Sequence, residues 1–277
     1  MQYDLAFIGP SRVLNTLDMS VFEKELHANS INLGLSGAGY AEQYLMLKTF
    51  MDENKNRIKK LFIEISYFNV IDPDSSFSYP FHEYYYFPYI QKEFVYEIIK
   101  DNAESKLKAM AWRYIPLIRY AEFNINFRPL ILFTSTIEKG SGDRGFDKHG
   151  DMLLDKEMGE DHNKGTYSNS QMNGKTISYL EKMITLAKEY KTEVTLFTAP
   201  AYNRGFSYSK EAFANYRRVV NEVVNRYGIK YCDFECIDMC NNKSYFADKT
   251  HLNKRGARLF SEAFCDTLNY SHNFSGE

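Results

Sequence analysis

Three polar residues at opposite ends of the chain have the types that nucleophilic acyl transfer requires. Ser11 lies in the stretch "FIGPSR", directly after the apolar run 5–8, and Asp248 precedes His251 by three residues in "DKTHLNKRGARLFSEAF". A histidine base, oriented by an aspartate, can take the serine proton and so create a nucleophile for a carbonyl carbon. Taken singly, however, a serine at a strand end is usually a helix cap, and D-x-x-H is a common helix-start signal. The fold must therefore bring the two segments together.

The composition favours one large domain and gives no reason to expect a nucleic-acid partner. The chain has 277 residues, a hydrophobic content of 44% and a formal net charge of −2. Such a chain can bury one sizeable core, and its charge would not attract a polyanion. No apolar run approaches the roughly 18 residues of a membrane helix, and Met1 leads directly into a predicted strand without a signal-peptide pattern. We expect a soluble chain as given, although an anchor removed from its amino terminus would leave the same sequence.

No metal or cofactor is predicted. The four cysteines all lie in the last fifth of the chain, and they are Cys232, Cys236, Cys240 and Cys265. Their spacing differs from that of iron–sulfur sites, so we predict reduced thiols. His149 and His162 stand among acidic residues that could in principle bind a metal, but a solvated acidic loop is the favoured interpretation.

Alternating strand-like and helix-like segments predict an α/β protein. The apolar runs 5–8, 30–35, 61–65, 194–198 and 229–234 have the character of buried strands, and amphipathic helical patterns separate most of them. Repeated βα units with right-handed crossovers form a parallel, doubly wound sheet. We therefore predict a flavodoxin-like, three-layer α/β/α fold whose five parallel strands have the order 2-1-3-4-5.

Two segments interrupt this alternation within a single domain spanning residues 1–277. Residues of about 72–127 are aromatic and helical in pattern, and residues of about 138–173 form a long polar loop. The first segment predicts a helical insert beside the catalytic edge, where Tyr84, Tyr85, Tyr86 and Phe87 would bind substrate. The alternative is that these aromatic residues form the core of the insert itself.

Ligands of an open parallel sheet bind beyond the carboxyl ends of the strands, and the predicted site residues follow those ends. Ser11 follows the first strand, Gly37 lies in "NLGLSGAGY" after the second, and His251 follows the fifth. The backbone N–H groups of Ser11 and Gly37 could bind the oxyanion of an acyl-transfer intermediate, because glycine permits a close approach of the backbone.

These motifs, in this order along nearly the whole chain, resemble the SGNH/GDSL hydrolase superfamily. The similarity is strongest to its surface-polymer acyltransferases, which include the DltD-like and alginate-acetylation proteins. The resemblance implies that Ser11 is the nucleophile, Gly37 an oxyanion donor, Asp248 the orienting carboxylate and His251 the base. The family's Gly-x-Asn-Asp block is absent. Its Asn position is occupied by Phe68 in "EISYFN", which leaves Asn69 as the candidate side-chain oxyanion donor.

The resemblance implies a serine-dependent acyl-ester hydrolase or O-acyltransferase that needs no cofactor. Its substrate would be an acylated carbohydrate or another acyl donor of a cell-surface polymer, with a possible membrane-bound acyl-transfer partner. Family members commonly act outside the cytoplasm or at a membrane; a cytoplasmic location is the alternative. The second functional hypothesis is a catalytically inactive relative that binds carbohydrate.

Overall fold

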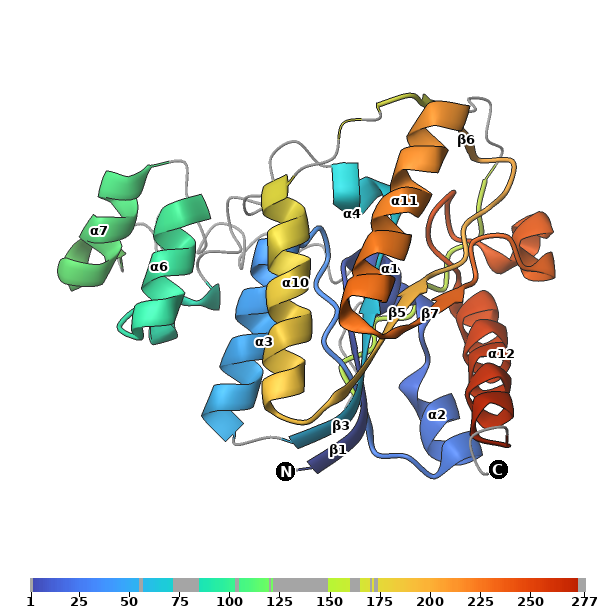
Figure 1. Ribbon diagram of the computed structural model, residues 1–277, viewed down its shortest axis with the longest axis horizontal. Coiled ribbons are helices and arrows are strands. Elements are labelled where there is room, and N and C mark those ends of the chain that lie inside the picture. Colours follow the sequence, from blue (N-terminus) through green and yellow to red (C-terminus); the bar gives the residue numbers. More distant parts are fainter. Residues whose placement is uncertain are drawn as a thin grey trace.

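A five-stranded parallel β-sheet forms the centre of the computed structural model (Figure 1). The structure describes residues 2–54, 57–71, 85–102, 105–119, 121, 149–159, 165–169, 171 and 174–273. In chain order the strands are β1 (Gln2–Ile8), β2 (Ser30–Asn32), β3 (Arg57–Glu64), β5 (Glu193–Thr198) and β7 (Lys230–Asp233). Their order across the sheet is β2-β1-β3-β5-β7. This is the 2-1-3-4-5 order predicted from the sequence, so the α/β class and the sheet topology are confirmed.

Helices cover both faces of the sheet and produce three layers (Figure 1). One face is covered by α3 (Tyr40–Asn54), α10 (Gly174–Glu189) and α11 (Lys210–Tyr227), and the other by α2 (Met19–Leu26) and α12 (Lys254–Asn273). The alternation of side chains along β1 explains this arrangement, because successive residues of a strand point to opposite faces. Ala6 and Ile8 pack in the first core, and Leu5 and Phe7 in the second.

Aromatic packing fixes the central strand beneath the predicted nucleophile. The ring of Phe7 stacks on Phe62 of β3 at 4.8 Å between centroids and meets Phe22 of α2 at 4.7 Å. Phe264 of α12 contacts Phe7 edge-on at 5.8 Å. Aromatic pairs in such geometries add stabilisation beyond the apolar area that they bury. The end of β1 is therefore held from both the sheet and the helical layer.

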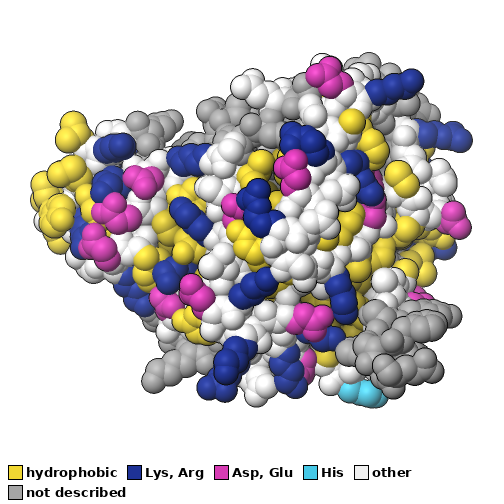
Figure 2. Space-filling model, viewed as in Figure 1, with side chains coloured by type: hydrophobic (Ala, Val, Ile, Leu, Met, Phe, Trp, Pro, Cys, Tyr) yellow, Lys and Arg dark blue, Asp and Glu magenta, His cyan; other side chains and the backbone are white. Residues whose placement is uncertain are grey.

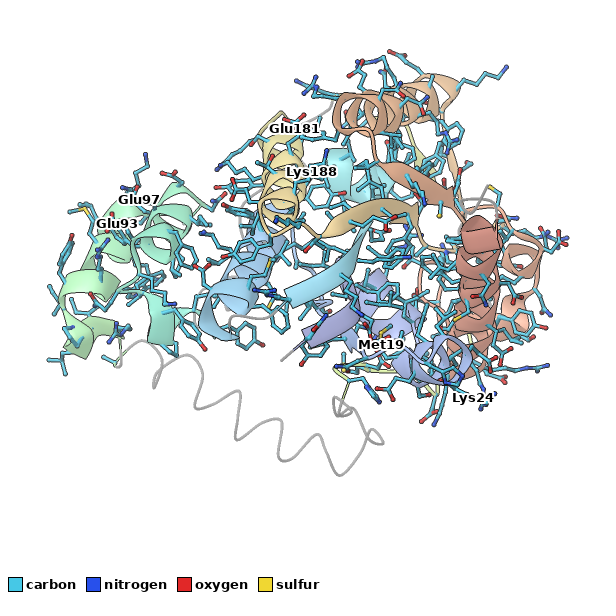
Figure 3. The ribbon with its side chains drawn as sticks, turned by 60° about the horizontal axis from the view of Figure 1, so that its bottom comes forward. Met19, Lys24, Glu93, Glu97, Glu181 and Lys188 are labelled. Atoms are coloured by element: carbon cyan, nitrogen blue, oxygen red, sulfur yellow. The ribbon has the colours of Figure 1, made fainter. Side chains whose placement is uncertain are left out.

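The described helices of the predicted insert pack against α3. Its described elements are η1 (Phe87–Tyr89), α6 (Glu93–Asn102) and α7 (Lys106–Tyr114), which share a core with Leu45 of α3. Figure 3 shows α6, with Glu93 and Glu97, beyond α3 and on the opposite side of the molecule from Met19 and Lys24 of α2. Large hydrophobic side chains are exposed on α7, among them Leu107 and Tyr114, and yellow side chains gather there in Figure 2.

Part of the predicted polar loop belongs to the folded core. His149 and Asp151 are both buried, and the Asp151 carboxylate accepts hydrogen bonds from the backbone N–H of Met19 and from the side chain of Asn32. The expectation of a solvated acidic loop was therefore wrong at these two positions, because Asp151 satisfies polar groups at the start of α2. Further along, β4 (Gly165–Tyr167) pairs in parallel with β6 (Phe206–Tyr208), which the sequence had not predicted. His162 lies outside the described residues.

The remaining composition-based expectations concern membrane helices, metals and cysteines. Among the helices of the described residues, none is long and apolar enough to cross a membrane. The same part of the chain contains no cluster of three or more His, Cys, Asp or Glu residues that could hold a metal ion. All four cysteines are free thiols, and Cys236 is the exposed one among them.

Candidate active site

Ser11 is the first residue of α1 (Ser11–Thr16), and two residues separate it from the end of β1. The turn between them requires glycine at position 9, because a Cβ there would lie 2.3 Å from Cγ2 of Val13 and 2.8 Å from Cβ of Glu64. No side chain caps the amino terminus of α1, whose preceding residue is Pro10. The first backbone N–H groups of a helix have no partner within the helix. The serine is thus presented at the carboxyl edge of the sheet, at the amino terminus of α1, where the N–H groups of Val13 and Leu14 donate to the carbonyl of Pro10.

A tight loop before α12 presents Asp248 and His251. Phe246 and Leu252 form an antiparallel bridge that closes the loop, and the backbone N–H of Ala247 donates to the carbonyl of His251 at 2.9 Å. Inside it, Oδ1 of Asp248 accepts the backbone N–H of Thr250 at 2.8 Å and that of His251 at 3.0 Å. The aspartate therefore organises the loop that carries the histidine.

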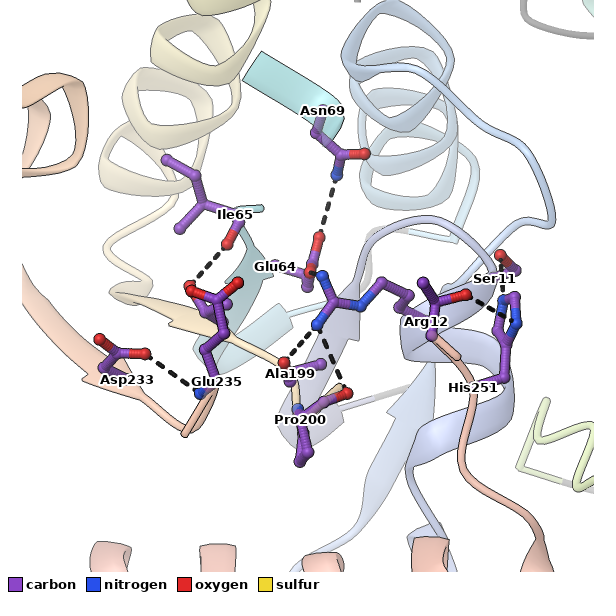
Figure 4. Close-up of polar contacts among 12 residues, drawn as sticks. Ser11, Arg12, Glu64, Ile65, Asn69, Ala199, Pro200, Asp233, Glu235 and His251 are labelled. Carbon is purple, nitrogen blue, oxygen red and sulfur yellow. Dashed lines mark hydrogen bonds and ion pairs between the residues drawn. The ribbon is translucent and has the colours of Figure 1, made fainter. Parts of the chain in front are cut away.

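The two segments meet in a continuous hydrogen-bonded chain. Nε2 of His251 lies 2.8 Å from Oγ of Ser11, while Nδ1 lies 2.9 Å from Oδ1 and 2.8 Å from Oδ2 of Asp248. Figure 4 shows the imidazole of His251 directed at Ser11. In this geometry the aspartate fixes the tautomer with a proton on Nδ1, so Nε2 is free to accept the serine proton. Ser11 is half-buried and the His251 side chain is 21% exposed, so both can be reached from solvent.

The electrostatics of the loop keep Asp248 ionised. Partial burial by itself would raise the pKa of its carboxyl group, but hydrogen bonds from the His251 side chain and from backbone N–H groups outweigh that effect. Together they hold the pKa of Asp248 well below its ordinary value. A permanently ionised carboxylate is what is needed to stabilise an imidazolium when His251 takes up a proton.

Gly37 lies in the loop after β2, which runs beside the Ser11 turn. The N–H of Leu35 donates to the carbonyl of Gly9 at 3.0 Å, so the two loops are hydrogen-bonded. Gly37 has a φ of 72°, a left-handed conformation that favours glycine. The structure thus places the predicted backbone donors, those of Ser11 and Gly37, in neighbouring segments.

Asn69 is engaged elsewhere. It lies in α4 (Tyr67–Ile71), and its Nδ2 donates to Oε2 of Glu64 at 2.9 Å. The physical reason is its position in the middle of α4, a short helix that begins three residues after the end of β3. The structure therefore brings Asn69 to a buried carboxylate, and at least one of its amide hydrogens is not available to an oxyanion.

That carboxylate belongs to a buried ion pair that the sequence analysis missed. Nη1 of Arg12, the residue after the nucleophile, lies 3.3 Å from Oε1 of Glu64, and the two side chains are 6% and 0% exposed. Nη2 of Arg12 donates to the carbonyl of Ala199 and lies 3.5 Å from that of Pro200 (Figure 4). Arg12 thus ties the first turn of α1 to the ends of β3 and β5. The signal was present in "LFIE", where a carboxylate ends an otherwise apolar strand.

Burial dominates the protonation of Glu64. Burial, together with the nearby charge of Glu235, raises the pKa of this carboxyl to about 7 against the opposing effect of Arg12. Burial likewise raises the pKa of Glu235, whose carboxylate accepts a hydrogen bond from Tyr208 at 2.7 Å. Arg12 therefore pairs with Glu64 behind the Ser11 turn, and its charge also acts on Glu235.

Removing the carboxylate of this pair should destabilise the fold. Glu64→Ala leaves Arg12 buried without its partner, and breaking a buried pair in this way costs about 3–5 kcal/mol. We expect that loss in the free energy of unfolding by urea at pH 8, where the Glu64 carboxyl is ionised. Glu222→Ala, which removes an exposed i,i+4 pair with Arg218, should cost no more than about 0.5 kcal/mol. Equal effects of the two substitutions would contradict the assigned role of the buried pair.

Two of the four aromatic residues predicted to bind substrate are buried in the core of the insert. Tyr86 and Phe87 are 3% and 7% exposed in the core of the insert, where Phe87 packs on Trp112 with ring centroids 5.1 Å apart. Their prediction as substrate-binding residues was wrong, because the insert buries them against α3 and α7. Tyr85 is 51% exposed, and Tyr84 lies outside the described residues.

Comparisons with known proteins yield similarity at the level of structure alone. The chain matches no family model, and no curated protein is significantly similar to it in sequence. Among solved structures, it is similar to the crystal structure of a proposed acylhydrolase from Bacteroides fragilis, with 13% sequence identity and a TM-score of 0.43. That similarity covers 97% of this chain and 87% of the other.

Proposed function

We propose that this protein is a serine-dependent acyl-ester hydrolase or O-acyltransferase of the SGNH type. The observation that carries the proposal is the Asp248–His251–Ser11 chain of hydrogen bonds, with 2.8 Å between Nε2 of His251 and Oγ of Ser11. Such an arrangement activates a serine hydroxyl that would otherwise be a weak nucleophile. The order and spacing of the motifs that resemble the SGNH superfamily give independent support.

In the first half of the proposed reaction, Oγ of Ser11 attacks the carbonyl carbon of the ester while Nε2 of His251 takes its proton. The negative charge that develops on the carbonyl oxygen is met by the backbone N–H groups of Ser11 and Gly37. Asp248 stabilises the imidazolium. The imidazolium then protonates the leaving alcohol oxygen as the ester bond breaks, which leaves the acyl group on Ser11.

The second half repeats these steps with a new nucleophile. His251 takes a proton from a water molecule or a carbohydrate hydroxyl, whose oxygen attacks the acyl-serine. Collapse of the intermediate returns the proton to Oγ of Ser11 and releases a carboxylic acid or a newly acylated sugar. Hydrolysis and transfer therefore use the same residues and differ only in the acceptor. The proposed physiological substrate is an acyl group of a carbohydrate or cell-surface polymer.

An acyl-enzyme trapping experiment tests this function. Brief incubation with p-nitrophenyl acetate followed by acid quenching should leave an acetyl group on Ser11, detectable by peptide mass spectrometry. The Asp248→Asn variant should accumulate less of this intermediate because its base is misoriented. An acetyl group found only on lysines, at equal levels in wild type and Ser11→Ala, would reject catalysis and favour the alternative of a carbohydrate-binding protein.

Asn69 offers a separate test of the oxyanion hole. Because its amide donates to Glu64, we expect Asn69→Ala to lower kcat on p-nitrophenyl acetate less than about tenfold, whereas loss of a true oxyanion donor costs about 10²–10³. Unfolding should require less urea than for wild type, since Glu64 loses a hydrogen bond. A hundredfold loss of kcat with unchanged stability would instead assign Asn69 to the oxyanion hole.

A further inference from the structure

A cavity of about 320 Å³ lies beside the proposed catalytic loop, lined by residues that include Tyr202, Tyr208, Phe213, Glu235 and Cys236. Its volume is within the range of small-molecule sites, roughly 300–1,000 Å³, which are mostly apolar with a few placed polar groups. The cavity follows the carboxyl ends of β5 and β7, at the same edge of the sheet as Ser11. It therefore lies where ligands of an open parallel sheet are usually bound.

The cavity is joined directly to the catalytic loop. The backbone N–H of Tyr202 donates to the carbonyl of Lys249, which lies between Asp248 and His251. Gly205 packs so closely on Lys249 that a Cβ at position 205 would lie 2.9 Å from that side chain. On the other side, the carbonyls of Ala199 and Pro200 receive the Arg12 side chain. The segment that walls the cavity is thus held by both halves of the proposed active site.

Glu235 places a carboxylate in the wall of the cavity. The residue is only 6% exposed, and its Oε1 accepts the hydroxyl hydrogen of Tyr208 at 2.7 Å. Within the described part of the chain, its other carboxylate oxygen accepts no hydrogen bond. This oxygen is not fully enclosed, because it is not among the buried side-chain atoms of the described residues that lack a partner, and Glu235 lines the cavity. A group bound in the cavity could therefore donate a hydrogen bond to it.

The remaining lining indicates what kind of donor fits. The rings of Tyr208 and Phe213 stack at 5.7 Å with an interplanar angle of 17°, which provides a flat apolar wall. The charges of Arg12 and Arg217 already act on Glu235, and Lys210 also lines the cavity. Since two cationic groups serve this carboxylate, a third cation is disfavoured. An acyl chain is disfavoured as well, because it offers no hydrogen-bond donor to the second oxygen of Glu235.

We propose that this cavity binds the hydroxyl-bearing part of the ester substrate, a sugar or polyol ring, whose hydroxyl donates to Glu235 and whose apolar face rests on Tyr208 and Phe213. The inference rests on the proposed function and assigns its carbohydrate subsite. It replaces Tyr86 and Phe87, which the insert buries, with residues that follow β5 and β7.

Substrate selectivity tests the assignment. Mono-acetyl esters of the methyl pyranosides of glucose, galactose, mannose and N-acetylglucosamine are compared with p-nitrophenyl acetate, which need not fill the cavity. At least one sugar ester should lose about 10–100-fold in kcat/KM in Glu235→Ala, as expected when a hydrogen bond to a charged group is removed. Glu235→Gln keeps the shape of the side chain, so it is a second variant that tests the carboxylate if Glu235→Ala does not fold. In both variants the loss on that sugar ester should exceed the loss on p-nitrophenyl acetate at least tenfold, whereas the exposed control Glu222→Ala should stay within about threefold of wild type on both substrates.

The exposed thiol provides a second readout that does not depend on the Glu235 substitutions. Cys236 lines the cavity, while Cys240 and Cys265 are buried. Labelling Cys236 with a bulky methanethiosulfonate should inhibit turnover of the sugar ester but not of p-nitrophenyl acetate. The same reagent should not inhibit the Cys236→Ser variant. The Ser11→Ala variant should bind the same sugar ester without turning it over, and the bound ester should slow the labelling of Cys236.

Three outcomes would overturn the inference. Equal losses on both substrate types, sugar-ester activity that is insensitive to Glu235 and Cys236, or a changed preference for acyl-chain length in Phe213→Ala would each remove the sugar subsite. The last result would assign the cavity to the acyl group. Failure of the proposed function itself is distinguishable, because Ser11→Ala would then retain turnover of every ester.

Discussion

Ser11→Ala and His251→Ala are each expected to lower kcat on an activated acetyl ester by several orders of magnitude. The first removes the attacking oxygen, and the second removes the base that lies 2.8 Å from it. In enzymes with this constellation, loss of either residue costs up to about 10⁶ in kcat. Release of p-nitrophenol from p-nitrophenyl acetate measures the effect after subtraction of the uncatalysed rate.

The double variant shows whether Ser11 and His251 act in one shared step or contribute independently to kcat. Because the serine and histidine act in one proton transfer, Ser11→Ala/His251→Ala should be hardly slower than either single variant. Ser20→Ala removes an exposed hydroxyl from the neighbouring helix α2 and should leave kcat unchanged. Multiplicative losses in the double variant would show that the residues do not work together.

Asp248→Asn should retain the fold and lose roughly 10³–10⁴ in kcat. The asparagine oxygen can still accept the backbone N–H groups of Thr250 and His251, so the loop should keep its shape. Its amide hydrogens, however, would favour the tautomer with the proton on Nε2, and that nitrogen could no longer take the proton of Ser11. Steady-state kinetics, with near-wild-type unfolding by urea, would demonstrate the effect.

A matched substitution shows whether this loss is specific. Asp238→Asn makes the same change at an exposed aspartate of η2 (Asp238–Asn241) and should leave activity within about twofold. An Asp248→Asn variant that is equally active would mean that the aspartate only shapes the loop.

The sheet was predictable because its signals are local. Each strand is a short apolar run that ends in small or polar residues, and the helices between the strands bury one face, so βα succession and crossover handedness leave few topologies. The proximity of Ser11 to Asp248 and His251 followed from the same logic, since residues after the carboxyl ends of parallel strands meet at one edge. Their catalytic roles are what the substitutions above test.

Side-chain partnerships across the chain were not predictable. Nothing near Glu64 in the sequence indicates that Arg12 and Asn69 would meet its two carboxylate oxygens, because these contacts depend on how three elements converge. The aromatic run of the insert was ambiguous for another reason. Composition does not tell which face of an aromatic segment is buried. In this protein, Tyr86 and Phe87 are buried in a core shared with α3. Asp151 was misinterpreted because its acidic neighbours resemble those of a solvated loop.

Covalent labelling of the intact protein tests the central claim most directly. A fluorophosphonate probe reacts with a serine whose hydroxyl is activated by a neighbouring base and whose oxyanion hole is formed. We predict a single modified peptide that carries the probe on Ser11, no labelling of Ser11→Ala, and strongly slowed labelling of His251→Ala. If folded wild-type protein remains unlabelled while an active SGNH esterase is labelled alongside it, Ser11 is not an activated nucleophile and the proposed function is wrong.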